Sequence, residues 1–208
     1  MRYGSMVERK KAVRAAELLL RDEQHRTANE LAVALAGLRS AIRTEPADLD
    51  LLRRVMERLD LFAKIRRIIS TPEHAGGDMI AQLEELLRCM SFDRDEWPVC
   101  FSTSTLRLHL YQDLARTILR VVHEMLTNAF RHGVAGQPIS LAIKATKTRI
   151  EIRCVNACHR EAKSKRAGSG TGILQALCTG HGGSFASRTS KCRWVVRAVL
   201  PRSPRPEV

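Results

Sequence analysis

The sequence has 208 residues, with 35 Lys and Arg against 22 Asp and Glu, which gives a formal net charge of +13 at pH 7. Hydrophobic residues make up 44% and aromatic residues 4% of the chain, a composition that indicates a globular protein with a large helical share. Its apolar runs are too short to cross a bilayer, and the N-terminus does not resemble a signal peptide. We therefore expect a cytoplasmic protein of one or two domains, with no membrane partner.

The basic residues are mixed with acidic residues along helical patterns and form no stripe with aromatic residues. Because single-stranded nucleic acids stack on such stripes, we expect no nucleic acid partner. The densest basic cluster is Lys163, Lys165 and Arg166. The six cysteines are expected to be reduced thiols, mostly in the core. The spacing of Cys154, Cys158 and His159 matches a zinc site only loosely.

Two long helices are predicted in the first part of the chain. Apolar residues keep a helical period over residues 7–43 and again over 48–69, with a break around Pro46. A short connector predicts that the two helices lie antiparallel. Their apolar faces are broader than one partner covers, so we expect a four-helix bundle by homodimerisation or docking against the second domain.

His25 lies on the first of these helices, among charged residues. Such a histidine is most often a solvated surface residue. An exposed imidazole is also what a phosphoryl acceptor needs, because its neutral ring nitrogen is nucleophilic. Asn29, four residues later, is expected to share its helix face.

The second part of the chain reads as a mixture of strands and helices. A break at 71–77 precedes a helical pattern over 78–90, and a domain boundary is expected between about 71 and 95. Alternating apolar residues predict strands at 99–101, 106–110, 139–143, 150–155, 184–188 and 193–200. The proline-rich tail, 201–208, is expected to be disordered.

Residues 123–133 (HEMLTNAFRHG) form the stretch around which the chain is organised. They belong to a helical pattern that ends at Gly133. Glu124 and Asn128 are four residues apart and so point to the same side. A carboxylate can act as a base and an amide oxygen suits Mg²⁺, although a solvated pair of polar residues is the more frequent meaning of this spacing.

A glycine-rich stretch, 168–172 (GSGTG), precedes a helical pattern that restarts near Ile173. Glycines at the mouth of a helix let backbone amides approach a phosphate, which the helix N-terminus also attracts. A flexible loop is the plain alternative. The stretch lacks the lysine of a P-loop and does not directly follow a strand, so a Rossmann turn is not indicated.

Taken in order, these motifs resemble the transmitter core of two-component sensor histidine kinases over residues 7–200. Residues 25–31 (HRTANEL) are similar to the acceptor box of the HWE-type subfamily, and 123–133 to the N-box of a Bergerat-type (GHKL) ATPase domain. The resemblance implies that His25 is phosphorylated and that Glu124 is the catalytic base. It also implies that Asn128 ligates Mg²⁺ and that Arg131 and His132 lie near the nucleotide phosphates.

The glycine stretch resembles the second glycine box of the same family. The resemblance implies that Gly168, Gly170, Thr171 and Gly172 bind the nucleotide. One motif departs from the family: where an adenine-reading Asp-x-Gly is expected, this chain has Asn156-Ala157. Asn156 offers an amide oxygen to the adenine amine but carries no charge.

The resemblance implies an α+β fold in which an antiparallel helical hairpin (7–75) precedes a Bergerat-type α/β sandwich (76–200). The function implied is a histidine kinase core that autophosphorylates His25 from ATP with Mg²⁺ and passes the phosphoryl group to a response-regulator receiver domain. The alternative is a histidine phosphotransferase with a degenerate domain that uses no ATP, relaying phosphoryl groups between receiver domains. A homodimer through the hairpin is expected in both cases.

Overall fold

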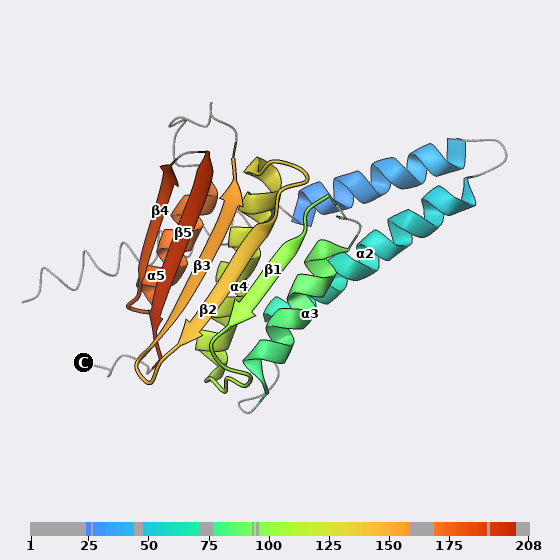
Figure 1. The fold of residues 1–208 in the computed structure, drawn as a ribbon. Coiled ribbons are helices and arrows are strands. Elements are labelled where there is room, and N and C mark those ends of the chain that lie inside the picture. The colour runs from blue at the N-terminus through green and yellow to red at the C-terminus, as the bar shows by residue number, and fades with distance from the viewer. Residues whose placement is uncertain are drawn as a thin grey trace, which may run out of the picture.

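A computed structural model gives the fold (Figure 1) and describes residues 24–25, 27–43, 48–70, 77–92, 94, 96–158, 169–190 and 192–202. After a first helical stretch, its elements are α2 (Leu49–Ser70), α3 (Met79–Ser91), β1 (Val99–Thr103), α4 (Gln112–His132), β2 (Ile139–Ala145), β3 (Arg149–Ala157), α5 (Ser169–Gly180), β4 (Ser184–Ser190) and β5 (Arg193–Pro201).

The first described helix, residues 27–43, lies antiparallel to α2 (Figure 1). Glu30 pairs with Arg58 at 3.3 Å. Further along, a β-carbon placed on Gly37 would come within 2.6 Å of the Val55 side chain, so the helices touch closely at this point. Residue numbers therefore increase along one helix while those of their partners decrease along the other, which confirms the expected antiparallel hairpin.

Aspartate caps begin both α2 and α3. Asp48 accepts a hydrogen bond from the Leu51 amide at 2.8 Å. Asp78 accepts from the Ile80 amide at 3.0 Å and from the Leu108 amide at 3.1 Å. Such caps satisfy amides that the first turn of a helix leaves without a partner. The caps therefore fix where each helix starts, one residue after the aspartate.

The C-terminal end of α2 docks on the core of the second part of the chain. Ile69 is buried, and Ile65 and Ile68 pack against the same apolar cluster that contains the buried face of α3. Of the two expectations for the hairpin's apolar face, docking is therefore observed at this end.

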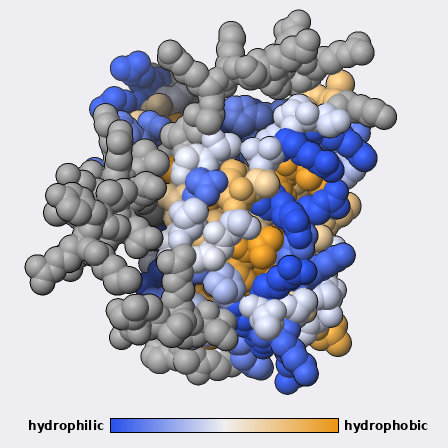
Figure 2. Space-filling model, turned by 90° about the vertical axis from the view of Figure 1, so that its left-hand side faces the viewer, coloured by the Kyte–Doolittle hydropathy of each residue, from blue (hydrophilic) through white to orange (hydrophobic). Residues whose placement is uncertain are grey.

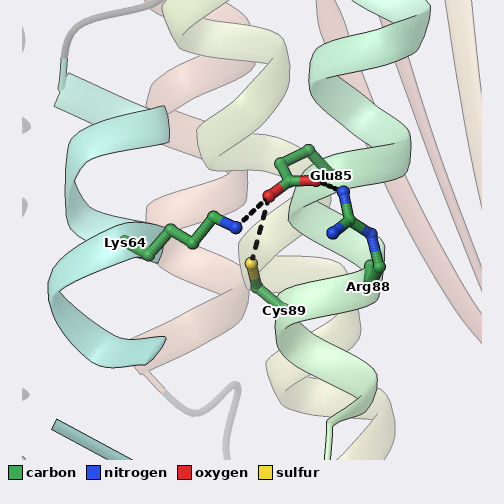
Figure 3. A network of polar contacts seen from close by, with 4 residues as sticks. All are labelled: Lys64, Glu85, Arg88 and Cys89. Atoms are coloured by element: carbon green, nitrogen blue, oxygen red, sulfur yellow. Dashed lines mark hydrogen bonds and ion pairs between the residues drawn. The ribbon is translucent and has the colours of Figure 1, made fainter. Parts of the chain in front are cut away.

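A polar cluster beside this contact joins α2 to α3 (Figure 3). Lys64 of α2 forms an ion pair with Glu85 of α3, which also pairs with Arg88. The Cys89 thiol lies 4.0 Å from the same carboxylate. The cluster holds the two helices in one register at the edge of their apolar contact.

The strands form one mixed sheet in the order β1-β2-β3-β5-β4, in which only β1 and β2 run parallel. Burial alternates along β2, where Ile139, Leu141 and Ile143 face the core. Helices α4 and α5 cover this face (Figure 1). The strands expected at 99–101, 139–143, 150–155, 184–188 and 193–200 are thereby confirmed.

The helix α4 packs against β3 and against the helices α2, α3 and α5. Apolar residues recur along it at helical spacing, which buries one broad face. Its buried side chains are Leu114, Ala115, Thr117, Ile118, Leu119, Val121, Val122, Glu124, Met125, Leu126, Ala129 and Phe130.

The other face of the sheet carries mainly small and cationic side chains. Arg153 of β3 stands directly opposite Arg197 of β5, and both are exposed. Glu151 accepts two hydrogen bonds of 2.8 Å from Arg197. The carboxylate thereby offsets part of the repulsion between the two arginines. Figure 2, which views the β4 side of the molecule, shows hydrophilic residues interrupted by smaller apolar patches.

One expected strand is wrong. Residues 106–110 alternate in hydropathy but form no strand. Their backbone bonds instead to the start of α3, because Asp78 accepts from the Leu108 amide and the Leu108 carbonyl accepts from the Met79 amide at 2.9 Å. Leu108 is buried, while Leu106 is 88% exposed. The segment is a loop that closes over the first turn of α3.

The fold is α+β, with a helical hairpin followed by an α/β sandwich, as expected from the sequence. Among the residues that the structure describes, no helix is both long and apolar enough to cross a bilayer. The boundaries 7–75 and 76–200 stay predictions, and residues 203–208 of the expected tail lie outside the described part.

Candidate functional site

Glu124 and Asn128 lie on one side of α4, as their spacing predicts. Glu124 is only 6% exposed, which is unusual for a carboxylate. The His123 ring nitrogen Nδ1 lies 3.7 Å from the Oε1 atom of Glu124. Asn128 is half-buried, and its amide nitrogen is buried without a hydrogen-bond partner among the described residues. A buried donor in this state favours a ligand that can accept from it.

At its C-terminal end, α4 meets the end of β3. Gly133, the residue after the helix, forms an isolated bridge with Cys158. A β-carbon on Gly133 would come within 2.5 Å of the Ala129 carbonyl and 2.7 Å of the Trp97 ring. Its φ of −75° is ordinary. Glycine is therefore required here by close approach, rather than by a left-handed backbone.

Asn156 of β3 faces this junction and is 3% exposed. Its amide nitrogen donates to the Ala157 carbonyl at 2.9 Å, and this donor–acceptor pairing assigns the other side-chain atom as the oxygen. A β-carbon on Gly133 would lie 3.3 Å from that nitrogen. The Asn156 Oδ1 atom is buried and accepts no hydrogen bond from any described residue. The junction therefore holds a buried acceptor that is suited to an N–H donor.

Arg131 and His132 are exposed at the end of α4. Partial burial lowers the pKa of His132, and the adjacent Arg131 charge lowers it further. The imidazole is therefore neutral at pH 7. Its neutral ring and the Arg131 guanidinium together offer a polar surface with one positive charge beside the junction.

The glycine-rich stretch differs from its expected form. Gly170, Thr171 and Gly172 lie within the first turn of α5, which starts at Ser169 rather than near Ile173. Helix α5 packs along α4, and this tertiary contact outweighs the low helix propensity of glycine. Gly168 lies outside the described residues, as do Lys163, Lys165 and Arg166.

Thr117 and His181 tie the far end of α5 to α4. The Thr117 hydroxyl lies 2.6 Å from the His181 ring nitrogen Nε2. Burial lowers the pKa of His181. The Asp113 carboxylate raises this pKa by a smaller amount, so the net shift is downward. The contact fixes how α5 lies along α4.

His25 is exposed on the first helix, and Arg94 connects that helix to α4. The Arg94 guanidinium carbon lies 4.4 Å from the centre of the Phe130 ring. Burial lowers the pKa of Arg94, the Arg58 charge lowers it further, and the Glu30 charge raises it. Arg94 thus contacts Phe130 and is within electrostatic reach of Glu30 and Arg58.

Sequence reasoning missed Arg94 and Trp97. Trp97 packs edge-on against Phe130, with ring centres 6.2 Å apart. No local pattern marks Arg94 or Trp97, because each contacts Phe130 on another element.

The described residues contain no cluster of three or more His, Cys, Asp or Glu side chains that could hold a metal. Cys154 faces the core, where burial raises the pKa of its thiol to about 12. His159 lies outside the described residues.

Comparison with known proteins shows the fold. No family model and no curated protein matches the sequence. A bacterial phosphotransferase structure aligns with a TM-score of 0.62 at 12% identity, covering 89% of this chain and 96% of the other. The histidine kinase domain of Erythrobacter litoralis EL346, a blue-light activated kinase, aligns with 0.51 at 19% identity, covering 91% and 94%.

The Acinetobacter baumannii histidine kinase AdeS also aligns, with a TM-score of 0.51 at 12% identity, covering 86% of this chain and 98% of that one. These three alignments each include most of both chains, so the likeness extends over the hairpin and the sandwich together. The chain therefore has the fold of a sensor histidine kinase transmitter core.

Proposed function

We propose that this chain is a histidine kinase core, which transfers the γ-phosphoryl group of ATP to His25 and then to a response-regulator aspartate. The observation that carries the proposal is the buried Oδ1 atom of Asn156, which lacks a donor among the described residues. An adenine exocyclic amine supplies such a donor. A buried acceptor without a partner costs about 1–3 kcal/mol. A nucleotide that donates a hydrogen bond to this atom removes that cost, which favours binding.

We assign the rest of the nucleotide and its Mg²⁺ to Asn128, Arg131 and the first turn of α5. Asn128 offers an amide to the cation and the phosphates, and Mg²⁺ commonly takes only one or two protein oxygens beside phosphate and water. We assign Arg131 the role of neutralising phosphate charge. The N-terminal turn of α5, with Gly170 and Gly172, adds amides and a partial positive charge. The bound cation supplies charge neutralisation at the transferring phosphoryl group.

Glu124 is the candidate base or orienting group for the transfer. Its burial and its position near His123 fix the carboxylate on the same side of α4 as Asn128. Arg94 connects the His25 helix with the Phe130 end of α4. His25 is solvent-accessible, so its imidazole can act as the nucleophile and later present the phosphoryl group to a receiver domain.

We also propose homodimerisation through the hairpin. Its far part exposes six large apolar side chains, each between 47% and 70% exposed, an amount that favours a partner surface. A second hairpin would complete a four-helix bundle. The exposed residues are Leu31, Val33, Leu35, Ile42, Leu49 and Met56. We place the reaction in the cytoplasm, where ATP and receiver domains are present.

A histidine phosphotransferase without ATP use is the second candidate. Asn156 is neutral where the family resemblance implies an aspartate, and a charged hydrogen bond is worth about 1.5–3 kcal/mol. The structural likeness to a bacterial phosphotransferase over most of both chains also supports it. In this candidate His25 has the same role, but the phosphoryl group comes from another receiver domain.

One experiment separates the candidates. The full chain is incubated with γ-labelled ATP and Mg²⁺, together with His25→Ala and the control His109→Ala, which removes another exposed histidine. Acid-labile label on the wild type and the control, but not on His25→Ala, supports the kinase. Label taken up only from a phosphorylated receiver domain supports the phosphotransferase. No label on His25 by either route contradicts both.

A further inference from the structure

Cys158 and Cys192 stand opposite each other at the end of the β3–β5 ladder. The last regular pair of this ladder is Ala157 with Arg193, so one further step pairs residues 158 and 192. The Cys158 amide donates to the Cys192 carbonyl at 2.8 Å, which confirms that these two residues are paired. Both cysteines are free thiols. From this juxtaposition, we propose that Cys158 and Cys192 form a reversible intramolecular disulfide when the protein meets a peroxide.

The spacing of the two strands suits this bond. Residues that face each other as a hydrogen-bonded antiparallel pair have α-carbons about 5.5 Å apart, and disulfides span roughly 4.4–6.8 Å. The Cys192 thiol also acts electrostatically on Cys158, which shows that the two side chains lie near each other. The backbone spacing therefore permits the bond. No other two described cysteines are opposed in this way: Cys154 faces Val196, and Cys100 faces Ser140.

The backbone at Cys192 supports a chemical role for the thiol. The last β4–β5 pair is Ser190 with Arg193, so the connection has only two residues. Cys192 has a φ of 59°, in the left-handed region, where such turns normally place glycine or asparagine. Its side chain is exposed and gains nothing from core packing. A cysteine at a position that disfavours a β-carbon is explained by the chemistry of its sulfur.

The two thiols have different accessibility, which sets the order of events. Burial raises the pKa of Cys158, and the neighbouring Cys192 raises it further. The exposed Cys192 thiolate attacks a peroxide oxygen first, giving a sulfenic acid and hydroxide. The Cys158 thiolate then displaces the second hydroxide from sulfur, forming the disulfide. Two thiols lose two electrons and two protons, while hydrogen peroxide gains both and becomes two waters.

Disulfides between adjacent strands with an exposed sulfur belong to the readily reduced class. The proposal therefore includes the return step. A dithiol or a glutathione-type thiol attacks the exposed Cys192 sulfur, and Cys158 leaves as the thiolate. The bond joins the end of β3, two residues after Asn156, to the β4–β5 turn. It encloses α5 and β4 in a loop of residues 158–192.

The test uses hydrogen peroxide on the full chain, followed by alkylation of free thiols and peptide mass analysis. We expect a Cys158–Cys192 linked peptide in the wild type and in Cys100→Ser, which removes the other exposed thiol. The linked peptide should be absent in Cys192→Ser and return to two free thiols with dithiothreitol. A disulfide that involves Cys100, a link between two chains, or no disulfide at all would overturn the proposal.

A second measurement excludes a bond formed only in unfolded chains. Closing a loop of this length in a native geometry should raise Tm by roughly 5–10 °C. We expect this shift on oxidising the wild type and Cys100→Ser but not Cys192→Gly, which also relieves the left-handed turn and so keeps the fold. A fall in Tm on oxidation, or an equal rise in Cys192→Gly, would contradict a native disulfide. Neither measurement depends on ATP binding or on His25.

Discussion

The guanidinium of Arg94 lies over the Phe130 ring, 4.4 Å from its centre, and this contact joins the loop before β1 to the end of α4. Arg94 is also within electrostatic reach of Glu30 and Arg58 on the hairpin. One side chain is thus in contact with the helix that carries Asn128 while its charge acts on the helix that carries His25. Arg94 is therefore the described side chain on which a positioning role between the two helices can be tested.

Arg94→Ala should therefore slow phosphorylation of His25 more than it weakens nucleotide binding. A cation–π contact is worth about 0.5–2 kcal/mol, so we expect a transfer rate reduced about three- to thirtyfold. The measurement is single-turnover labelling from ATP, beside a nucleotide titration. Arg107→Ala, an exposed arginine of a surface loop, is the control. Equal losses of rate and affinity would contradict a positioning role.

Asn156 should make the site prefer adenine to guanine. Its buried oxygen accepts from an exocyclic amine, whereas guanine presents a carbonyl at the corresponding position. Two facing acceptors leave the buried oxygen unsatisfied, at a cost of about 1–3 kcal/mol, so ATP should bind about five- to 150-fold more tightly than GTP. Asn156→Ala should remove most of this preference. Competition titrations with ATP and GTP measure this preference. An unchanged ratio of the two affinities in the variant would show that another residue recognises adenine.

Leu126→Ala should destabilise the fold strongly, because Leu126 is fully buried in α4. Removing a buried leucine side chain costs about 2–5 kcal/mol through lost burial and the cavity left behind. Leu106→Ala, at an 88% exposed leucine, should change the free energy of unfolding by less than about 0.5 kcal/mol. Urea unfolding followed by circular dichroism tests both. Similar losses of unfolding free energy in the two variants would contradict the assignment of Leu126 to the core.

His181 should make the protein less stable in mild acid. Burial lowers its pKa in the folded state, whereas in the unfolded chain it titrates near about 6.5. As pH falls through that value the unfolded state takes up the proton first, so the free energy of unfolding decreases. Above about pH 7.5 the histidine is neutral in both states and contributes no pH dependence.

Unfolding of His181→Asn at pH 7.5 and 5.5 measures this contribution. The variant should lose less stability between the two pH values than the wild type. His109→Asn, at an exposed histidine, should lose as much as the wild type. If all three proteins show the same pH slope, protonation of His181 is not the cause.

Local patterns were sufficient for most elements. The alternation over 139–155 placed the β2–β3 hairpin, because a strand with one buried face repeats every two residues. The same reasoning failed for 106–110. There, the alternation arises from a loop with Leu108 inserted under the start of α3, and its partner Asp78 is thirty residues away. Periodicity alone does not distinguish these two causes.

The site was predicted in its parts but not in its arrangement. The spacing of Glu124 and Asn128 places both on one side of a helix in any fold. By contrast, the contact of Gly133 with Asn156, and of Arg94 with Phe130, depends on how α4 meets β3 and the loop before β1. The roles of His25, Glu124, Asn128 and the glycine stretch stay predictions that the labelling experiment tests.

The sheet face that carries Arg153 and Arg197 has a consequence for crowded solutions. Arg153 and Arg197 stand side by side there, in a chain whose formal net charge is +13. Two copies that approach face to face present the same sign and repel each other. This repulsion reaches about 10 Å at 0.1 M salt and about 3 Å at 1 M. Concentrated salt therefore removes the barrier that keeps the sheets of separate molecules from stacking.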